Sequence, residues 1–251
     1  MDLGLDGGVY VVSGATRGLG RATAEVLIDE GARVVVSGRD PHEVLAAAAD
    51  LRTDRALGVV ADNADPSAPE RLVASAVARF GRIDGAMISV GGPPVGGLGD
   101  VTDEQWHAAF DSVFLGAVRL ARAVARSLPP RGGSIVLVLS SSVREPLPGL
   151  AISNGLRPGL AMVAKMMADE LGPKNIRVNG LLPGRISTDR TKSMDAGRSQ
   201  ADLERIRKSV PLGRDGRPVE FGQVAAFLLS PAASYLTGVM LPVDGGMLRS
   251  L

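Results

Sequence analysis

The chain has 251 residues, an ordinary length for one α/β domain and enough to bury a substantial core. Its 28 basic and 27 acidic residues leave a net charge of +1, which gives no sign of a nucleic-acid or anionic-membrane partner. It has no cysteine and only two histidines, so disulfides and thiolate chemistry are excluded and no metal site is expected.

Short apolar runs alternate with longer amphipathic stretches along the chain. Strands are predicted at 9–13, 33–37, 56–61, 85–90, 134–140, 177–182 and 239–243. Helices are predicted between them at 18–30, 41–51, 66–80, 102–128, 156–171 and 218–229. This alternation favours an α/β, doubly wound Rossmann fold, with a parallel sheet of about seven strands and helices on both faces. We expect one domain over residues 1–251.

One long irregular stretch, at about 185–210, follows the sixth predicted strand and has a charged, helix-like second half. A long insertion at the end of a strand often covers a substrate, so a lid is predicted here, with a solvated loop as the alternative. The N-terminal segment has neither the basic region nor the long apolar region of a signal peptide. We therefore expect a cytoplasmic protein without membrane contact.

A glycine-rich turn lies between the first predicted strand and the first predicted helix, at Ser13–Gly20. Glycines let the backbone approach a diphosphate, and free amides at a helix start attract negative charge. An apolar strand follows this helix, which completes the βαβ unit that such a motif requires. The predicted dinucleotide-binding residues of this turn are Gly14, Thr16, Arg17, Gly18, Leu19 and Gly20.

In order and spacing, the motifs of the chain resemble those of the short-chain dehydrogenase/reductase family, close to 3-oxoacyl-carrier-protein reductases. The residues that carry the resemblance are the Ser13–Gly20 turn, Asp62, Ile176-Arg177-Val178-Asn179, Pro183-Gly184, Thr188 and the C-terminal Val243-Asp244-Gly245-Gly246. The resemblance implies a nicotinamide cofactor and a homodimer or homotetramer. It also implies cofactor contacts at Asp62, Asn63, Gly91, Arg157, Pro183, Gly184 and Ile186.

The end of the second predicted strand indicates which cofactor is bound. Proteins that bind NAD place an acidic residue there for the ribose 2′-hydroxyl, whereas proteins that bind NADP place an arginine there for the 2′-phosphate. Here the corner is Ser37-Gly38-Arg39, with Asp40 past the ribose position and Arg17 as a second forked donor. We therefore predict NADP(H) rather than NAD(H).

The catalytic positions depart from the family pattern, which implies an asparagine, a serine, a tyrosine and a lysine. Ser140 occupies the serine position. Because Ser141 and Ser142 follow it directly, the alignment with the family pattern could be shifted by one or two residues. The Y-x-x-x-K segment reads Ser153-Asn154-Gly155-Leu156-Arg157, and Val113 replaces the asparagine. An aliphatic hydroxyl is a far weaker acid than a phenol, and an arginine does not exchange its proton. The predicted catalytic residues are Ser140, Ser153 and Arg157.

Three functions remain open on these residues. The first is an NADP(H)-dependent oxidoreductase that acts on a small carbonyl or secondary alcohol substrate through an atypical site. The second is an NADP(H)-binding protein with little or no redox activity, such as a sensor or a regulatory partner. The third is a non-redox enzyme on the same scaffold, because a fold does not fix a function.

Overall fold

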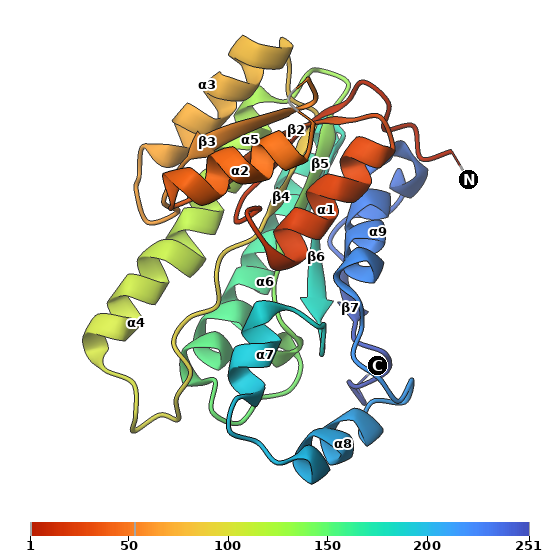
Figure 1. The fold of residues 1–251 in the computed structure, drawn as a ribbon. Helices are drawn as coiled ribbons and strands as arrows, with labels where there is room; N and C mark the ends of the chain where they lie inside the picture. Colours follow the sequence, from red (N-terminus) through yellow and green to blue (C-terminus); the bar gives the residue numbers. More distant parts are fainter. Residues whose placement is uncertain (1, 53, 251) are drawn as a thin grey trace.

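The computed structural model describes residues 2–52 and 54–250. Its seven strands form one parallel sheet, as the sequence predicted, and their order in the sheet is β3-β2-β1-β4-β5-β6-β7 (Figure 1). The strands are β1 (Val9–Val12), β2 (Arg33–Gly38), β3 (Ala56–Val60), β4 (Gly85–Ile88), β5 (Gly133–Val138), β6 (Ile176–Pro183) and β7 (Met240–Val243). The strand order reverses between β1 and β4, and a ligand crevice is expected outside the carboxyl ends of the strands at such a point.

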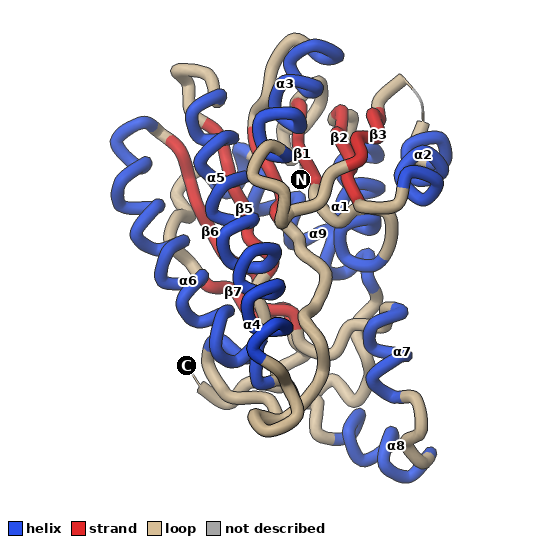
Figure 2. Tube along the Cα trace, turned by 90° about the vertical axis from the view of Figure 1, so that its left-hand side faces the viewer, coloured by secondary structure: helices blue, strands red, loops and turns tan. Residues whose placement is uncertain are grey.

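Helices cover both faces of the sheet (Figures 1 and 2). The α-helices are α1 (Gly18–Asp29), α2 (Pro41–Asp50), α3 (Ala68–Phe80), α4 (Asp103–Ala109), α5 (Gly116–Ser127), α6 (Ala151–Leu171), α7 (Asp189–Asp195), α8 (Gln200–Lys208) and α9 (Pro218–Leu229). The π-helix η1 is Phe110–Leu115, and the 3-10 helices are η2 (Ser141–Val143), η3 (Gly172–Lys174) and η4 (Pro231–Ala233).

Two buried clusters fill the space between the sheet and its helices. Val9 and Val11 of β1 point into the cluster under α3, α5 and α6. Tyr10 and Val12 point into the other cluster, under α1, α2 and α9. Successive side chains of a strand face opposite sides of a sheet, so a continuous apolar run is what a doubly covered strand requires.

Two predicted helices differ from the structure. The helix predicted at 102–128 is divided into α4, η1 and α5, because the π-helix inserts a wider turn in its middle. The helix predicted at 156–171 begins earlier, at Ala151, so Ser153 and Arg157 both lie within α6. Pro158 lies inside α6 and cannot donate to the carbonyl of Asn154, so the hydrogen-bond ladder is interrupted beside Arg157.

Arg177 on β6 joins the sheet to the end of α9. Its guanidinium donates to the carbonyls of Leu228 at 2.8 Å and Ser230 at 2.9 Å, and more weakly to Leu229 and Leu236. The last carbonyls of a helix have no partner within the helix, and Arg177 supplies charged donors to them. Ser134 Oγ also donates to the Leu228 carbonyl, and Asn179 Nδ2 to that of Leu236.

The stretch at 185–210 folds into α7 and α8, which lie together beyond the carboxyl end of β6 (Figures 1 and 2). In the described parts of the chain no helix is long and apolar enough to cross a membrane. Residues 2–52 and 54–250 likewise contain no group of three histidine, cysteine or acidic side chains that could hold a metal ion.

Candidate cofactor and active site

The glycine-rich turn leaves the start of α1 open. Gly14 and Gly18 have φ values of +59°, a conformation that side chains disfavour. A Cβ on Gly20 would lie 2.3 Å from the carbonyl oxygen of Gly14, so the turn and the helix approach each other only through glycine. The N-cap residue Arg17 makes no side-chain cap, and the first turn of α1 contains no acid. The unpaired amides therefore fit the diphosphate of a dinucleotide.

The corner beyond β2 holds two arginines, and the carboxylate of Asp40 is engaged in a helix cap there. The Asp40 carboxylate accepts from the amides of His42 at 2.8 Å and Glu43 at 3.0 Å, so it caps α2. These two hydrogen bonds lower the pKa of Asp40, and the bond from the Glu43 amide has the larger effect. Arg39 is exposed, whereas Arg17 pairs with the Glu43 carboxylate at 3.4 Å. The corner thus offers two guanidinium groups, one of them shared with Glu43.

Thr16 and Leu19 complete the turn. The Thr16 hydroxyl donates to the Glu43 carboxylate at 3.3 Å. The Thr16 methyl group packs so close to Gly38 that a Cβ on this glycine would lie 2.7 Å from it. Leu19 packs against the apolar cluster under α1. Both residues therefore position the turn through contacts within the chain.

The other cofactor residues predicted by resemblance lie around the same edge. The Asp62 carboxylate accepts from the amide of Ala64 at 2.9 Å, so part of its capacity is used in a local turn. Asn63 reaches the Ser89 carbonyl at 3.5 Å. A Cβ on Gly91 would meet nothing within 4 Å, so this part of the backbone is open to a ligand.

The end of β6 supplies Pro183, Gly184 and Ile186. Gly184 lies so close to Asp244 that a Cβ added to Gly184 would be 2.5 Å from the Cβ of Asp244. Ile186 is buried and forms a backbone bridge with Gly216. The segment therefore leaves the sheet in a fixed direction toward α7.

The three serines after β5 have different partners. Ser140 Oγ accepts from the amide of Ser142 at 3.1 Å, which leaves its hydroxyl hydrogen free to donate to a substrate oxygen. Ser142 Oγ lies 3.2 Å from Ser153 Oγ, and both side chains are buried. Ser153 is thus joined to Ser142 rather than to Ser140.

Arg157 is the least satisfied polar side chain at this edge. It is 5% exposed and donates through Nη1 to the Val138 carbonyl. Its Nε is the buried side-chain atom that lacks a hydrogen-bond partner among the described residues. Burial, and then the nearby charge of Arg190, lowers the pKa of Arg157 to about 10, so it remains charged at neutral pH. A ligand that brings an acceptor would satisfy it.

Neither tyrosine is placed to replace the missing phenol. Tyr10 is buried in β1, where desolvation and the charge of Asp84 raise its pKa to about 12. Tyr235 is fully exposed after η4. Val113 lies buried in η1 and offers no polar group for a water relay.

Two contacts hold the loop that precedes α6. Asn154 accepts from the Leu147 amide at 3.0 Å and donates to the Leu147 carbonyl at 2.9 Å. Gly96 pairs with the same loop through Gly149 and Ala151, at 2.8 and 3.1 Å. The loop at 144–150 and the loop at 91–97 therefore form one wall beside Ser140.

Sequence reasoning did not single out Arg190 as a site residue. It projects from α7 and donates to the carbonyls of Gly92 at 3.3 Å and Pro93 at 2.9 Å. A Cβ on Gly92 would lie 2.1 Å from Arg190 Cζ, so a larger residue at this position would displace the guanidinium from where it rests. The one signal for it in the sequence is its place two residues after Thr188. Asn154 was also missed, although it lies inside the altered motif.

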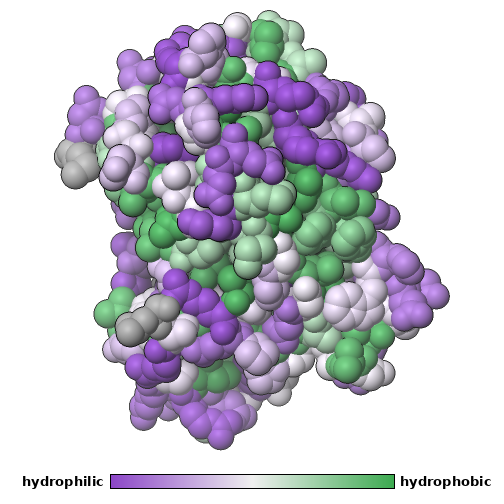
Figure 3. Space-filling model, turned by 180° about the vertical axis from the view of Figure 1, so that it is seen from behind, coloured by the Kyte–Doolittle hydropathy of each residue, from purple (hydrophilic) through white to green (hydrophobic). Residues whose placement is uncertain are grey.

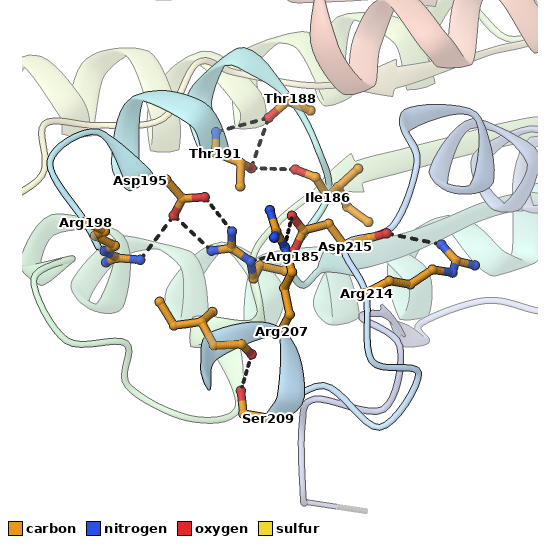
Figure 4. Close-up of polar contacts among 11 residues, drawn as sticks. Arg185, Ile186, Thr188, Thr191, Asp195, Arg198, Arg207, Ser209, Arg214 and Asp215 are labelled. Carbon is orange, nitrogen blue, oxygen red and sulfur yellow. Dashed lines mark hydrogen bonds and ion pairs between the residues drawn. The ribbon is translucent and has the colours of Figure 1, made fainter. Parts of the chain in front are cut away.

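A cluster of ion pairs fixes the segment that carries α7 and α8 (Figure 4). Arg185 lies between Asp195, at 2.5 Å, and Asp215, at 2.6 Å. Arg198 and Arg207 add longer pairs to these two carboxylates. The bonds to Asp195 raise the pKa of Arg185 and lower that of Asp195. The segment is therefore tied at its start, middle and end.

Known proteins resemble the chain over nearly its full length. The family model described as enoyl-(acyl carrier protein) reductase matches residues 14–248. Dehydrogenase/reductase SDR family member 4 of Bos taurus is 36% identical over 251 residues, covering 98% of this chain and 89% of the relative.

Two solved structures are also similar. L-sorbose reductase of Gluconobacter frateurii, complexed with NADPH and L-sorbose, has a TM-score of 0.92 at 31% identity and full coverage of both chains. A short chain oxidoreductase of Pseudomonas aeruginosa PAO1, described as containing an atypical catalytic center, has a TM-score of 0.91 at 29% identity. That match covers 99% of this chain and 100% of the other.

Proposed function

Because the chain belongs to the short-chain dehydrogenase/reductase family, we propose that it is an NADP(H)-dependent oxidoreductase acting on a carbonyl or secondary alcohol. The observation that carries this proposal is the uncapped start of α1 behind Gly14, Gly18 and Gly20, beside a corner with two arginines and no free acid at the ribose position. NADPH, when bound, supplies the hydride for the carbonyl carbon.

Three side chains would act on the substrate and the cofactor. Ser140 donates its free hydroxyl hydrogen to the carbonyl oxygen, which polarises the carbonyl. Arg157 donates Nε–H to a ribose hydroxyl and stabilises the negative charge that develops on the substrate oxygen. The proton for that oxygen passes through Ser153, which Ser142 orients at 3.2 Å, or through a bound water.

A second candidate function is NADP(H) binding with little or no redox activity. It is favoured by the absence of a phenol from the site, because Tyr10 is buried in β1 and Tyr235 is exposed after η4. A site with an aliphatic hydroxyl and an arginine has no group whose pKa lies near neutrality, as general acid catalysis prefers.

Calorimetry with NADPH and NADH, followed by a carbonyl panel monitored by NADPH absorbance, tests both candidates. The oxidoreductase proposal expects tighter binding of NADPH and turnover of at least one carbonyl. Binding without turnover on a broad panel, together with turnover by the S153Y/R157K double variant, supports the second candidate. No binding of either nucleotide contradicts both.

We also propose a homodimer or homotetramer. Seen from behind, hydrophobic residues gather across the middle of the molecule, between more hydrophilic upper and lower parts (Figure 3). On α6, Met162 and Met166 are 70% and 51% exposed, and large exposed apolar patches mark interaction surfaces. Light scattering after size exclusion checks this, and a monomer at all concentrations contradicts it.

A further inference from the structure

Two arginines at the active-site edge carry positive charge without a carboxylate partner. Arg157 bonds only the Val138 carbonyl, and its buried Nε is unpaired. Arg190 bonds only carbonyl groups of loop 91–97. Within residues 2–52 and 54–250, neither guanidinium forms an ion pair with an acidic side chain. The carbonyl of Val138 ends β5, and those of Gly92 and Pro93 follow the neighbouring parallel strand β4, so the two arginines are held at the same edge of the sheet. The charge of Arg190 also contributes to the lowered pKa of Arg157.

Another arginine of the same segment does have carboxylate partners. Arg185, at the start of the same segment, is paired with Asp195 at 2.5 Å and with a second carboxylate. Asp189 is next to Arg190 in sequence, yet it pairs with Lys192 at 3.5 Å. Arg157 is buried, whereas Arg190 is exposed. A buried charge without a counter-charge is unfavourable, and a nearby like charge adds repulsion. An arrangement of this kind is relieved by a ligand that brings negative charge.

The pair lies where a substrate would lie. Arg190 bridges α7 to loop 91–97, and this loop is bonded to the loop that precedes α6. Ser153 precedes Arg157 by one helical turn on α6. A group held between the guanidinium groups is therefore close to the hydroxyl groups that would handle the reacting oxygen.

We propose that Arg157 and Arg190 form an anion subsite for a substrate that bears a carboxylate near its carbonyl or secondary alcohol. A guanidinium offers a planar fork of donors that matches a carboxylate, and such charge-assisted bonds are the stronger class. This inference rests on the proposed oxidoreductase function, because it names the substrate class of that same site.

The cofactor does not supply the missing charge in this arrangement. Its diphosphate fits the start of α1, and its 2′-phosphate fits the corner with Arg17 and Arg39. The ribose hydroxyls that Arg157 would bind accept hydrogen bonds but carry no charge. A carboxylate on the substrate is then the group that balances the pair.

The test uses protein saturated with NADPH and short oxo acids, namely pyruvate, acetoacetate and levulinate, each compared with its methyl ester. Binding is measured by calorimetry and by the shift in unfolding temperature, so the readout does not depend on turnover. At least one acid should bind about tenfold more tightly than its ester. The Arg190→Met variant should lose this preference, whereas Arg190→Lys should retain part of it.

The control variant is Lys192→Met, which removes an exposed cation from the same helix and should leave the preference intact. Both methionine variants should bind NADPH within about twofold of the wild type, as expected for changes outside the phosphate contacts. Equal binding of acids and esters overturns the anion subsite while leaving NADPH binding in place. Acids that bind only without NADPH also overturn it, because the pair would then serve a cofactor phosphate. Failure of NADPH itself to bind removes the proposed function instead.

Discussion

Replacing Arg157 with methionine should stabilise the ligand-free protein. Burial lowers the pKa of this guanidinium well below its ordinary value, to about 10, so the native state holds the proton less tightly than the unfolded chain. The charged form therefore destabilises the fold at every pH below about 10, and only above that pH is the penalty relieved. At about 1.4 kcal/mol per pKa unit the penalty is roughly 3 kcal/mol.

The variant also loses the hydrogen bond from Arg157 to the Val138 carbonyl, a loss of about 1–2 kcal/mol. A net gain of about 1–2 kcal/mol remains, which corresponds to a rise in Tm of about 3–6 °C for a chain of this size. Thermal unfolding at pH 7 without nucleotide measures it. The same variant should lose affinity for NADPH, because the donor to the ribose is gone.

Arg177→Met is the matched control. Arg177 is also partly buried, and desolvation lowers its pKa, but its guanidinium donates to three carbonyls at the end of α9 and to that of Leu236 beyond η4. Removing it takes a charged donor from each of these carbonyls and should lower Tm by several degrees, since about 2 kcal/mol is lost. If Arg157→Met lowers Tm as Arg177→Met does, Arg157 is satisfied within the protein and the reasoning is refuted.

The 2′-phosphate corner, the glycine turn and the Arg185 cluster each allow one more prediction. Glu43→Gln removes the carboxylate that shares Arg17, so calorimetry should show NADPH binding about two- to fivefold more tightly and NADH unchanged; equal gains for both contradict this. Gly20→Ala places a Cβ 2.3 Å from the Gly14 oxygen and should abolish nucleotide binding and lower Tm, an argument that unaltered binding would refute. Asp195 stabilises the segment that carries α7 and α8 at pH values above the pKa of an unfolded aspartate, about 4. This contribution is lost as the pH falls toward the lower native pKa of Asp195. Limited proteolysis of 189–208 should rise in that range, and Asp195→Asn should show the rise at pH 7; equal cleavage of both proteins at pH 7 counts against the role.

The fold and the cofactor turn could be predicted because their signals are local. The apolar run at β1, the glycines that follow it and the amphipathic period of α1 are contiguous, so spacing alone orders them. Ser140 could be located by counting, since no insertion separates it from Ser153. These parts of the structure depend on neighbouring residues.

The contacts of Arg190 could not be predicted in the same way. Its partner Gly92 is 98 residues away, and the contact depends on the direction in which the chain leaves β6. The division of the helix at 102–128 has a similar cause, because the residues of η1 have no helix-breaking composition. Side-chain pairing across the site is set by tertiary packing, which a periodic pattern does not encode.

Asn154 gives the wall formed by the loops at 144–150 and 91–97 a property that bears on selectivity. The side-chain amide of Asn154 accepts from the backbone N–H of Leu147 and donates to its carbonyl. The wall is therefore ordered before any ligand binds. The conformational entropy of that loop is then lost during folding rather than at binding, which favours affinity for a molecule of matching shape. The same rigidity penalises bulkier molecules, so the protein should accept a narrow range of substrates.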